Sequence, residues 1–323
     1  MSGQVDMPLR RLGRSGLVVS VVGLGTNNLG MKLDFDTSRE VVHAALDAGI
    51  TLFDTADVYG ASEERLGEIL RGHRDNVVIA TKFGSDVRRL GNDNGDDWNA
   101  RGARRYVRRA VEASLRRLRT DWIDLYQLHR PDALTPIEET LSTLDDLVHE
   151  GKVRYLGHSN FTGWQVAHAE WTARQRGFEH FVSAQNEYNL LRRDIEQDVV
   201  PALREYGIGL LPYYPLASGL LTGKYRRGAD VPEGSRIQAW GLQSVLRDET
   251  FDAIEALEAF AGQRELSLLD VAIGGLAAQQ AVSSVIAGAT SADQVRANVR
   301  AVRWQPSAAD LADLDALTRK SAG

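Results

Sequence analysis

Residues 52–60 read LFDTADVYG, and this stretch raises the question that decides the fold. Two apolar residues, Leu52 and Phe53, run directly into Asp54, and Tyr59 follows five residues after that carboxylate. A single polar residue after an apolar run carries little information, because loops commonly begin with one. The stretch becomes informative only if other apolar runs in the chain end in the same way.

Eight short apolar runs recur along the chain, and segments with helical periodicity follow them. The runs are VSVVGLG, TLFDTAD, NVVIATKFG, WIDLYQLHR, VRYLGHSN, HFVSAQNEYN, IGLLPYYPLA and SSVIAGATS. The helical segments are 37–48, 63–70, 103–118, 137–149, 164–176, 195–206, 251–264 with 268–280, and 292–302. Apolar strands that alternate with helices predict a parallel sheet covered on its outer face.

Eight such units are the number that closes a (β/α)8 barrel. We therefore predict an α/β fold, with residues 1–323 as a single TIM-barrel domain and LRRLGRSGLVVS as a hairpin ahead of it. Thr37, Ser62, Thr250, Ser267 and Ser291 are expected to start helices. Two stretches, 84–102 and 218–250, are long for connectors and follow strands, so we expect functional loops on the C-terminal face of the barrel.

The composition excludes several classes of function. The chain has 323 residues, is 43% hydrophobic and 25% charged, and carries a formal net charge of −6. This is ordinary globular composition without a basic surface for nucleic acid. The densest basic stretch, 101–119, has an apolar stripe at helical spacing, so we interpret it as one face of an amphipathic helix.

Cysteine and targeting signals are also informative. There is no cysteine, which excludes disulfides, thiolate nucleophiles and cysteine-ligated zinc. The stretch MSGQVDMPLRRLGRSG lacks the apolar segment of a signal peptide. No run approaches the roughly 20 apolar residues that cross a bilayer. We expect a cytoplasmic protein with neither a nucleic-acid nor a membrane partner.

Other apolar runs do end on polar residues. After Asp54, the ends of the following runs carry Lys82, His129, Ser159 with Asn160, Gln185 and Tyr213. In a closed barrel, residues at the carboxyl ends of successive strands converge on one mouth. The pattern therefore predicts a polar site that contains an acid, an amine and an imidazole.

Four of these residues suit proton transfer to a carbonyl oxygen. A tyrosine phenol has a pKa near 10, and a nearby ammonium lowers it. Lys82 could supply that charge to Tyr59, and Asp54 could keep the buried Lys82 ionised, while His129 could bond a substrate oxygen. The alternative is a structural Asp54–Lys82 ion pair with Tyr59 packed beside it. No side chain here supplies a hydride, so a redox function requires a cofactor.

The quoted motifs together resemble one family. LGRSGLVVSVVGLGT, GITLFDTADVYG with SEERLGEIL, IATKFG, DLYQLHRPD, LGHSNF, YYPLASGLLTGKY and VIAGATSADQVRANVRA follow in the order and spacing of the aldo-keto reductases. The resemblance covers nearly the whole chain. It implies NAD(P)-dependent reduction of aldehydes and ketones, or the reverse, on a small-molecule substrate.

The resemblance also implies roles for residues. The catalytic tetrad would be Asp54, Tyr59, Lys82 and His129, with Tyr59 donating the proton. The positions that match cofactor contacts are Gly25, Thr26, Asp54, Ser159, Asn160, Gln185, Tyr213, Pro215, Leu216, Ser218, Gly219, Leu221, Lys224, Ile286, Gly288, Gln294 and Asn298. No metal is implied. Trp98 and Trp240 could line an aromatic substrate pocket or cover the barrel mouth.

Two positions depart from the family pattern. NADPH-using members often carry Lys or Arg where this chain has Gly288, Thr290 and Gln294, and a phosphate dianion prefers charged donors. The resemblance implies NADP(H) as the cofactor, but because these basic residues are missing, NAD(H) is also expected to bind. The second departure is Tyr214, where serine is common and to which we assign no role.

Three alternatives compete with this interpretation. A doubly wound nucleotide fold would use GLGTNN, but Asn28 replaces the third glycine and LGMKLDFDT separates the motif from the expected helix. A regulatory protein would resemble the β subunits of potassium channels, whose fourth-strand position departs from histidine, whereas this chain has His129. A metal-dependent barrel hydrolase would need clustered ligands at the strand ends. The sequence predicts no particular oligomeric state.

Overall fold

The computed structural model describes residues 7–90 and 92–319. Residues 1–6, which belong to the stretch examined for a signal peptide, lie outside the described part of the chain. So do residue 91 of the first long loop and residues 320–323.

Eight parallel strands form the centre of the molecule in the order β10-β3-β4-β5-β6-β7-β8-β9. Their bounds are β3 (Val22–Gly25), β4 (Leu52–Asp54), β5 (Val78–Phe83), β6 (Ile123–Leu128), β7 (Val153–Ser159), β8 (Phe181–Gln185), β9 (Gly209–Leu210) and β10 (Val285–Gly288). The two ends of this sheet also meet, because Leu210 bridges Val282 in parallel and the Ile286 amide donates to the Pro212 carbonyl at 3.0 Å. The predicted (β/α)8 barrel is confirmed.

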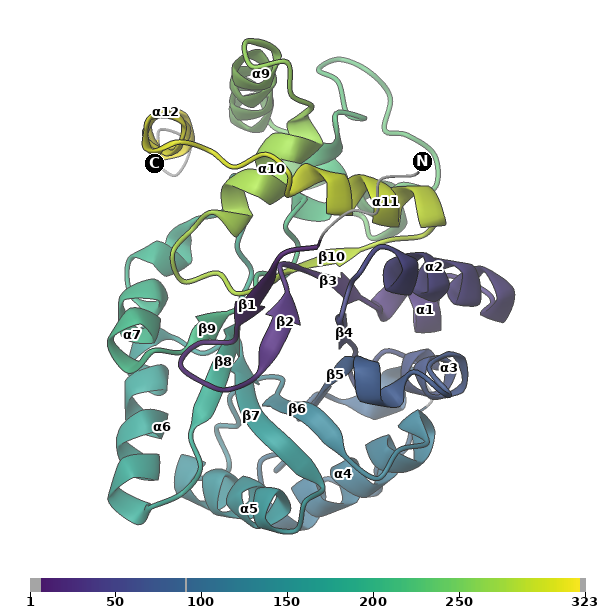
Figure 1. Ribbon diagram of the computed structural model, residues 1–323, viewed down its shortest axis with the longest axis vertical. Coiled ribbons are helices and arrows are strands. Elements are labelled where there is room, and N and C mark those ends of the chain that lie inside the picture. The colour runs from purple at the N-terminus through teal and green to yellow at the C-terminus, as the bar shows by residue number, and fades with distance from the viewer. Residues whose placement is uncertain (1–6, 91, 320–323) are drawn as a thin grey trace.

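Helices surround the strands (Figure 1). In chain order they are α1 (Asn27–Met31), α2 (Phe35–Asp47), α3 (Ser62–Ile69), α4 (Arg104–Leu118), α5 (Ile137–His149), α6 (Gly163–Arg176), α7 (Val199–Tyr206), α8 (Arg236–Ala239), α9 (Asp248–Gly262), α10 (Leu268–Ala277), α11 (Ala292–Ala301) and α12 (Ala308–Arg319). Each strand from β4 to β8 is followed by a helix that packs outside the barrel.

The predicted N-terminal hairpin is present. β1 (Leu9–Arg11) pairs antiparallel with β2 (Val18–Ser20), and Figure 1 shows both in front of the barrel strands. The hairpin buries Leu12 and Val19 against the apolar side chains inside the barrel, which include Leu125 and Leu211. This packing closes the end of the barrel where the strands begin. The opposite end, where the strands finish, remains for the site.

Several helix boundaries show where sequence signals succeed or fail. Ser267 and Ser291 cap α10 and α11 as predicted, since each side chain accepts a bond from the backbone nitrogen three residues later. The helix predicted from Thr37 begins earlier, because Asp34 caps it by accepting from the Thr37 nitrogen at 2.8 Å. The helix that was expected to start at Thr250 begins at Asp248. The five-residue helix α1 begins directly after Thr26, contrary to our expectation for LGMKLDFDT, although the closed barrel excludes the doubly wound fold.

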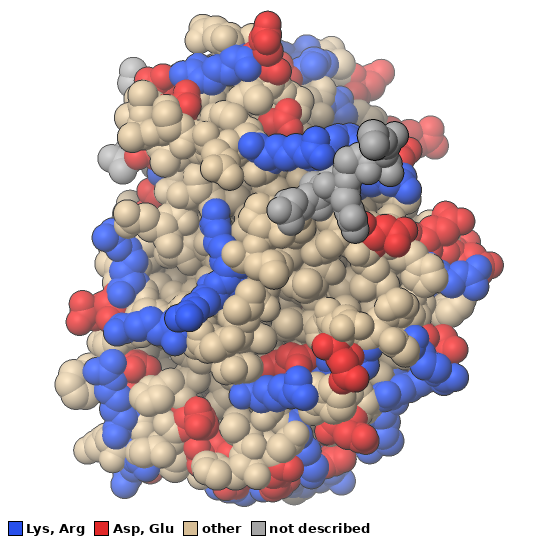
Figure 2. Space-filling model, in the orientation of Figure 1, with Lys and Arg blue, Asp and Glu red and all other residues tan. Residues whose placement is uncertain are grey.

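The basic stretch 101–119 forms helix α4 as predicted. The expected apolar stripe, Val107, Val111, Leu115 and Leu118, is buried. Its arginines pair with acids of neighbouring helices; Arg108, for example, bonds Glu150 at 2.7 Å. On the face drawn in Figure 2, acidic and basic side chains likewise lie next to one another over the peripheral helices. In the part of the chain that is described, no helix is both long and apolar enough to cross a membrane.

One buried histidine lies on the outer side of the sheet. His158 on β7 is fully buried, stacks on Phe161 at 4.4 Å between ring centroids, and meets Phe181 edge-on at 5.3 Å. Neither ring nitrogen has a hydrogen-bond partner among the described residues. Burial lowers the pKa of His158 from 6.5 to about 3. The folded chain therefore holds this imidazole in its neutral form.

We expect His158 to make the fold sensitive to mild acid. Because its pKa is depressed on folding, its contribution to stability is complete above the unfolded pKa of 6.5 and is lost as pH falls toward 3. Between pH 7.5 and 5 the free energy of unfolding should fall by about 2 kcal/mol more in the native chain than in His158→Phe, which cannot titrate. Urea denaturation of both proteins across this range measures the difference, and parallel curves would contradict it.

Candidate functional site

The four residues predicted to form the tetrad converge at the carboxyl ends of the strands. Asp54 ends β4, Lys82 lies near the end of β5, and His129 directly follows β6. The Lys82 ammonium lies 2.6 Å from Asp54 Oδ2 and 5.1 Å from the centroid of the Tyr59 ring. The rings of Tyr59 and His129 meet edge-on with centroids 5.9 Å apart. One cluster therefore contains a phenol, an ammonium, a carboxylate and an imidazole.

Both oxygens of the Asp54 carboxylate accept hydrogen bonds. Its Oδ2 accepts from Lys82, and its Oδ1 accepts from Gln185 Nε2 at 2.8 Å and from Gln127 Nε2 at 3.2 Å. Gln127 was not among the predicted site residues. Its position was indicated by the sequence, since it stands two residues before His129 and alternate residues of a strand share a face.

Lys82 retains its charge although it is completely buried. Burial alone would lower its pKa, but the Asp54 carboxylate and then Tyr59 outweigh burial, so the pKa of Lys82 is raised. The ammonium also donates to the Thr55 carbonyl at 2.8 Å. A fixed positive charge is thus held beneath the Tyr59 ring.

The Tyr59 phenol differs from the sequence-based expectation in one respect. The charge of Lys82 does lower the pKa of Tyr59, as expected, but burial raises that pKa by more, and Asp54 and Tyr214 add to the rise. The net pKa of Tyr59 is therefore raised rather than lowered. A phenol with a raised pKa is protonated at neutral pH, which suits a proton donor.

His129 is neutral in this environment. Burial, followed by the charges of Lys82 and Arg130, holds its pKa well below the usual 6.5. Its Nδ1 is buried without a hydrogen-bond partner among residues 7–90 and 92–319. A neutral imidazole can donate one hydrogen bond to a ligand oxygen without competing for the proton of Tyr59.

The residues expected to hold a carboxamide form a connected group beside the tetrad. Asn160 has a left-handed backbone (φ 62°), and its amide donates to the His129 carbonyl at 3.0 Å. Tyr213 Oη donates to Asn160 Oδ1 at 2.8 Å, and Ser159 Oγ donates to the Gln185 carbonyl at 2.7 Å. Ser159, Asn160, Gln185 and Tyr213 are thus brought together at the same mouth as His129.

Other positions matched to cofactor contacts border this group. Gly25 pairs with Gly288 where β3 and β10 end, and Thr26 Oγ1 donates to the Asp54 carbonyl at 2.9 Å. Ser218 (φ 58°) and Gly219 (φ 97°) have left-handed backbones, and the Lys224 chain lies against Gly219. Of these residues, Thr26 is buried, Gly25, Ser218 and Gly219 are half-buried, and Gly288 is exposed.

The remaining matched positions differ in accessibility. Leu221 packs in an apolar cluster against α9 and α10, and Ile286 lies inside the barrel against Gly23 and Gly25. Pro215 and Asn298 are buried, and Leu216 is half-buried. Gln294 turns its Oε1 back to accept from the Thr290 nitrogen at 2.8 Å. Gln294 itself is exposed, whereas Leu221 and Ile286 are buried.

Both tryptophans of the long loops are exposed. Trp98 is 66% exposed and stacks on Arg105, 3.7 Å from the guanidinium carbon to the ring centroid. Trp240 is 46% exposed and lies near Tyr214, with centroids 6.4 Å apart. Arg236 lies 5.4 Å from the Tyr214 ring and 4.9 Å from the Trp240 ring. Tyr214, to which the sequence analysis assigned no role, thus belongs to an aromatic group beside the mouth.

Within the described residues, neither a metal site nor the cavity at the other end of the barrel competes with the mouth as the candidate active site. No group of three His, Asp or Glu residues among them is arranged to hold a metal ion, as the hydrolase alternative requires. A cavity of about 630 Å³ lies at the opposite end of the barrel, beside the hairpin turn. Its charged residues are largely paired; Glu170, for example, holds Arg174 at 2.7 Å and His180 at 3.0 Å. The groups arranged for chemistry are at the mouth.

Comparisons with known proteins identify the family to which the chain belongs. A sequence model of the Aldo/keto reductase family matches residues 21–319. The chain is 34% identical over 308 residues to a probable voltage-gated potassium channel subunit beta of Oryza sativa subsp. japonica, covering 92% of this chain and 91% of the relative. It is 36% identical over 310 residues to the uncharacterized oxidoreductase YrpG of Bacillus subtilis (strain 168), covering 90% of each. It is 32% identical over 313 residues to the L-glyceraldehyde 3-phosphate reductase of Escherichia coli (strain K12), covering 92% and 88%.

Proposed function

The chain belongs to the aldo/keto reductase family, and from this premise we propose that it interconverts small carbonyl compounds and alcohols with NAD(P)(H). The observation that supports this most is the cluster of a protonated Tyr59, a charged Lys82 and a neutral His129 at one barrel mouth. Such a cluster can give a proton to a carbonyl oxygen and stabilise the tyrosine phenolate that is left behind. Bound nicotinamide would supply the hydride.

Each residue has a distinct task in this proposal. Tyr59 Oη donates its proton to the substrate oxygen, and the neutral His129 orients that oxygen by a hydrogen bond. The phenolate that results is stabilised by the Lys82 charge, which is 5.1 Å from the ring centroid. Asp54 keeps Lys82 ionised through the 2.6 Å ion pair. With the oxidised nicotinamide as hydride acceptor, reversing these proton movements would give alcohol oxidation.

The residues around the mouth fit a nicotinamide dinucleotide chemically. Asn160 and Gln185 carry the donors and acceptors that a carboxamide needs, and Tyr213 offers a half-buried ring beside them. Lys224 and the left-handed backbone at Ser218 and Gly219 suit a pyrophosphate. The start of α11, capped by Ser291, could receive a second phosphate.

The proposal is tested by incubating the purified chain with small aldehydes and ketones and either reduced nicotinamide, following absorbance at 340 nm. L-glyceraldehyde 3-phosphate belongs in the panel because a relative is named as its reductase. We expect turnover of at least one carbonyl compound. Binding of nicotinamide without any turnover would favour the second candidate, a regulatory partner protein, which the similarity to named channel β subunits supports.

We predict that the chain binds NADH and NADPH with similar affinity. Neither Lys nor Arg is present at Gly288, Thr290 or Gln294, and the nearby Arg296 is paired with Asp293 at 2.9 Å. A 2′-phosphate would therefore gain few charged hydrogen bonds at these positions. Fluorescence-quenching titration with both nucleotides measures the two affinities.

A matched variant sharpens this comparison. Gln294→Arg should tighten NADPH binding about tenfold, close to 1.4 kcal/mol, and leave NADH unchanged. A native preference for NADPH of roughly a hundredfold, about 2.7 kcal/mol, would contradict the prediction.

A further inference from the structure

The first long loop, residues 84–102, contacts the turn that carries Tyr59. The side-chain amide of Asn92 donates to the backbone carbonyls of both Asp57 and Gly60, at 2.5 and 2.8 Å. These two carbonyls stand on either side of Tyr59 in the chain. One amide group thus holds both ends of residues 57–60, which we call the tyrosine turn.

A second asparagine ties the same turn to helix α4. Asn94 is 3% exposed, and its Nδ2 donates to Asp57 Oδ2 at 2.8 Å. Its Oδ1 accepts from both terminal nitrogens of Arg117 at 3.2 Å, and Arg117 in turn pairs with the buried Glu63 at 2.7 Å. Asn92 and Asn94 are therefore both tied to the barrel.

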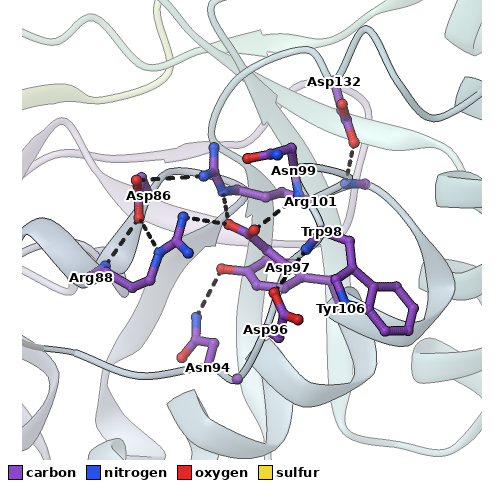
Figure 3. A network of polar contacts seen from close by, with 12 residues as sticks. Asp86, Arg88, Asn94, Asp96, Asp97, Trp98, Asn99, Arg101, Tyr106 and Asp132 are labelled. Carbon is purple, nitrogen blue, oxygen red and sulfur yellow. Dashed lines mark hydrogen bonds and ion pairs between the residues drawn. The ribbon is translucent and has the colours of Figure 1, made fainter.

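The part of the loop that follows Asn94 is held by its own polar contacts (Figure 3). Asp97 is 7% exposed and accepts from Arg101 Nε at 2.7 Å, while Arg88 approaches it at 3.5 Å. The end of the loop is fixed by the Gly102 nitrogen, which donates to Asp132 Oδ2 at 2.6 Å. Asn92 is consequently presented by an ordered scaffold.

The opposite side of the tyrosine turn meets helix α1 through backbone alone. A Cβ on Gly30 would lie 1.8 Å from the Tyr59 carbonyl oxygen, and one on Gly60 would lie 2.9 Å from the Gly30 carbonyl oxygen. The Tyr59 nitrogen also donates to the carbonyl of Ala56, the residue just before the turn, at 3.1 Å. Backbone packing against α1 limits the turn, and the Asn92 amide adds hydrogen bonds to the carbonyls of Asp57 and Gly60.

We propose that Asn92 is a positioning residue for Tyr59. Its two hydrogen bonds fix the turn so that the phenol keeps its place beside Lys82 and His129. This inference rests on the proposed function, in which Tyr59 is the proton donor. A displacement of about 1 Å in a reacting group can cost roughly a hundredfold in rate, so the loss of Asn92 should lower kcat.

The test compares Asn92→Ala and Asn92→Asp with a control in the same loop. Asn92→Asp removes the donor and places a carboxylate against two carbonyl oxygens. Asn99→Asp makes the same charge change at an exposed residue that bonds Asp97 only through its backbone nitrogen, at 2.9 Å. With NADPH and a small aldehyde, both Asn92 variants should lose about 10- to 100-fold in kcat, with nicotinamide Kd within twofold, while Asn99→Asp stays near wild type. A change confined to the aldehyde KM would show that Asn92 only lines the substrate path, and would overturn the proposal.

Hydrogen exchange of the wild type and Asn92→Ala gives a readout that does not depend on turnover. Peptides covering residues 57–60 should exchange faster in the variant, and peptides from β6 or α9 should not. Unchanged exchange would overturn the positioning role even if the wild type reduced none of the carbonyl compounds tested. Faster exchange together with normal kcat in an active enzyme would overturn it as well. An inactive wild type whose variant shows faster exchange would instead count against the proposed function alone.

Discussion

Replacing Tyr59 by Phe is expected to lower kcat for aldehyde reduction by about a thousandfold while nicotinamide binding stays near wild type. Tyr59 is half-buried, and desolvation of its phenol raises its pKa, so it carries a proton at neutral pH. Removing a positioned general acid typically costs 10²- to 10⁴-fold. The ring itself remains in Phe, so packing against Lys82 and His129 is preserved.

Tyr126→Phe is the matched control for this change. Tyr126 on β6 is fully buried, and its hydroxyl has no hydrogen-bond partner among the described residues. Removing that hydroxyl deletes the same atom from a second tyrosine of the barrel, so kcat should stay within about twofold and stability should not fall. Tyr59→Phe with near-normal turnover would remove Tyr59 from the role of proton donor.

The sequence was most informative where a residue's position follows from the strand that carries it. Asp54, Lys82 and His129 occupy the ends of three successive strands, and the barrel brings such ends together whatever the loops do. The same reasoning extends to Gln127, whose place two residues before His129 puts it on the inner face beside Asp54. Strand periodicity thus predicts the centre of the candidate site.

The sequence did not predict features that depend on how opposing pKa effects compare or on how a loop folds. The net pKa of Tyr59 depends on whether burial or the Lys82 charge is larger, and burial follows from packing of distant segments. The contacts of Asn92 with Asp57 and Gly60 depend on how a loop of irregular backbone folds back on an earlier turn. Neither periodicity nor local propensity encodes such contacts, which is why this loop appeared in the sequence only as an unusually long connector.

Lys82→Met should have the second large effect, on stability and on pH dependence together. Lys82 is fully buried and pairs with Asp54, so its removal leaves a buried carboxylate that keeps its hydrogen bonds from Gln185 and Gln127 but loses its cation. Breaking a buried ion pair on one side typically costs 3–5 kcal/mol. In alcohol oxidation Tyr59 must act as phenolate, and without the Lys82 charge its pKa rises further, so the residual rate should increase toward alkaline pH.

The double variant Asp54→Asn, Lys82→Met separates the tuning role from a purely structural ion pair. It removes both charges while the Asn oxygen can still accept from Gln185 and Gln127, so urea denaturation should show most of the lost stability restored. Its oxidation rate should keep the alkaline shift of the single variant, because the phenolate still lacks its ammonium. A structural pair predicts the same recovery of stability but an unshifted pH profile. The pH profile is therefore the measurement that distinguishes the two, and a profile like that of the wild type in both variants would leave Lys82 with a structural role alone.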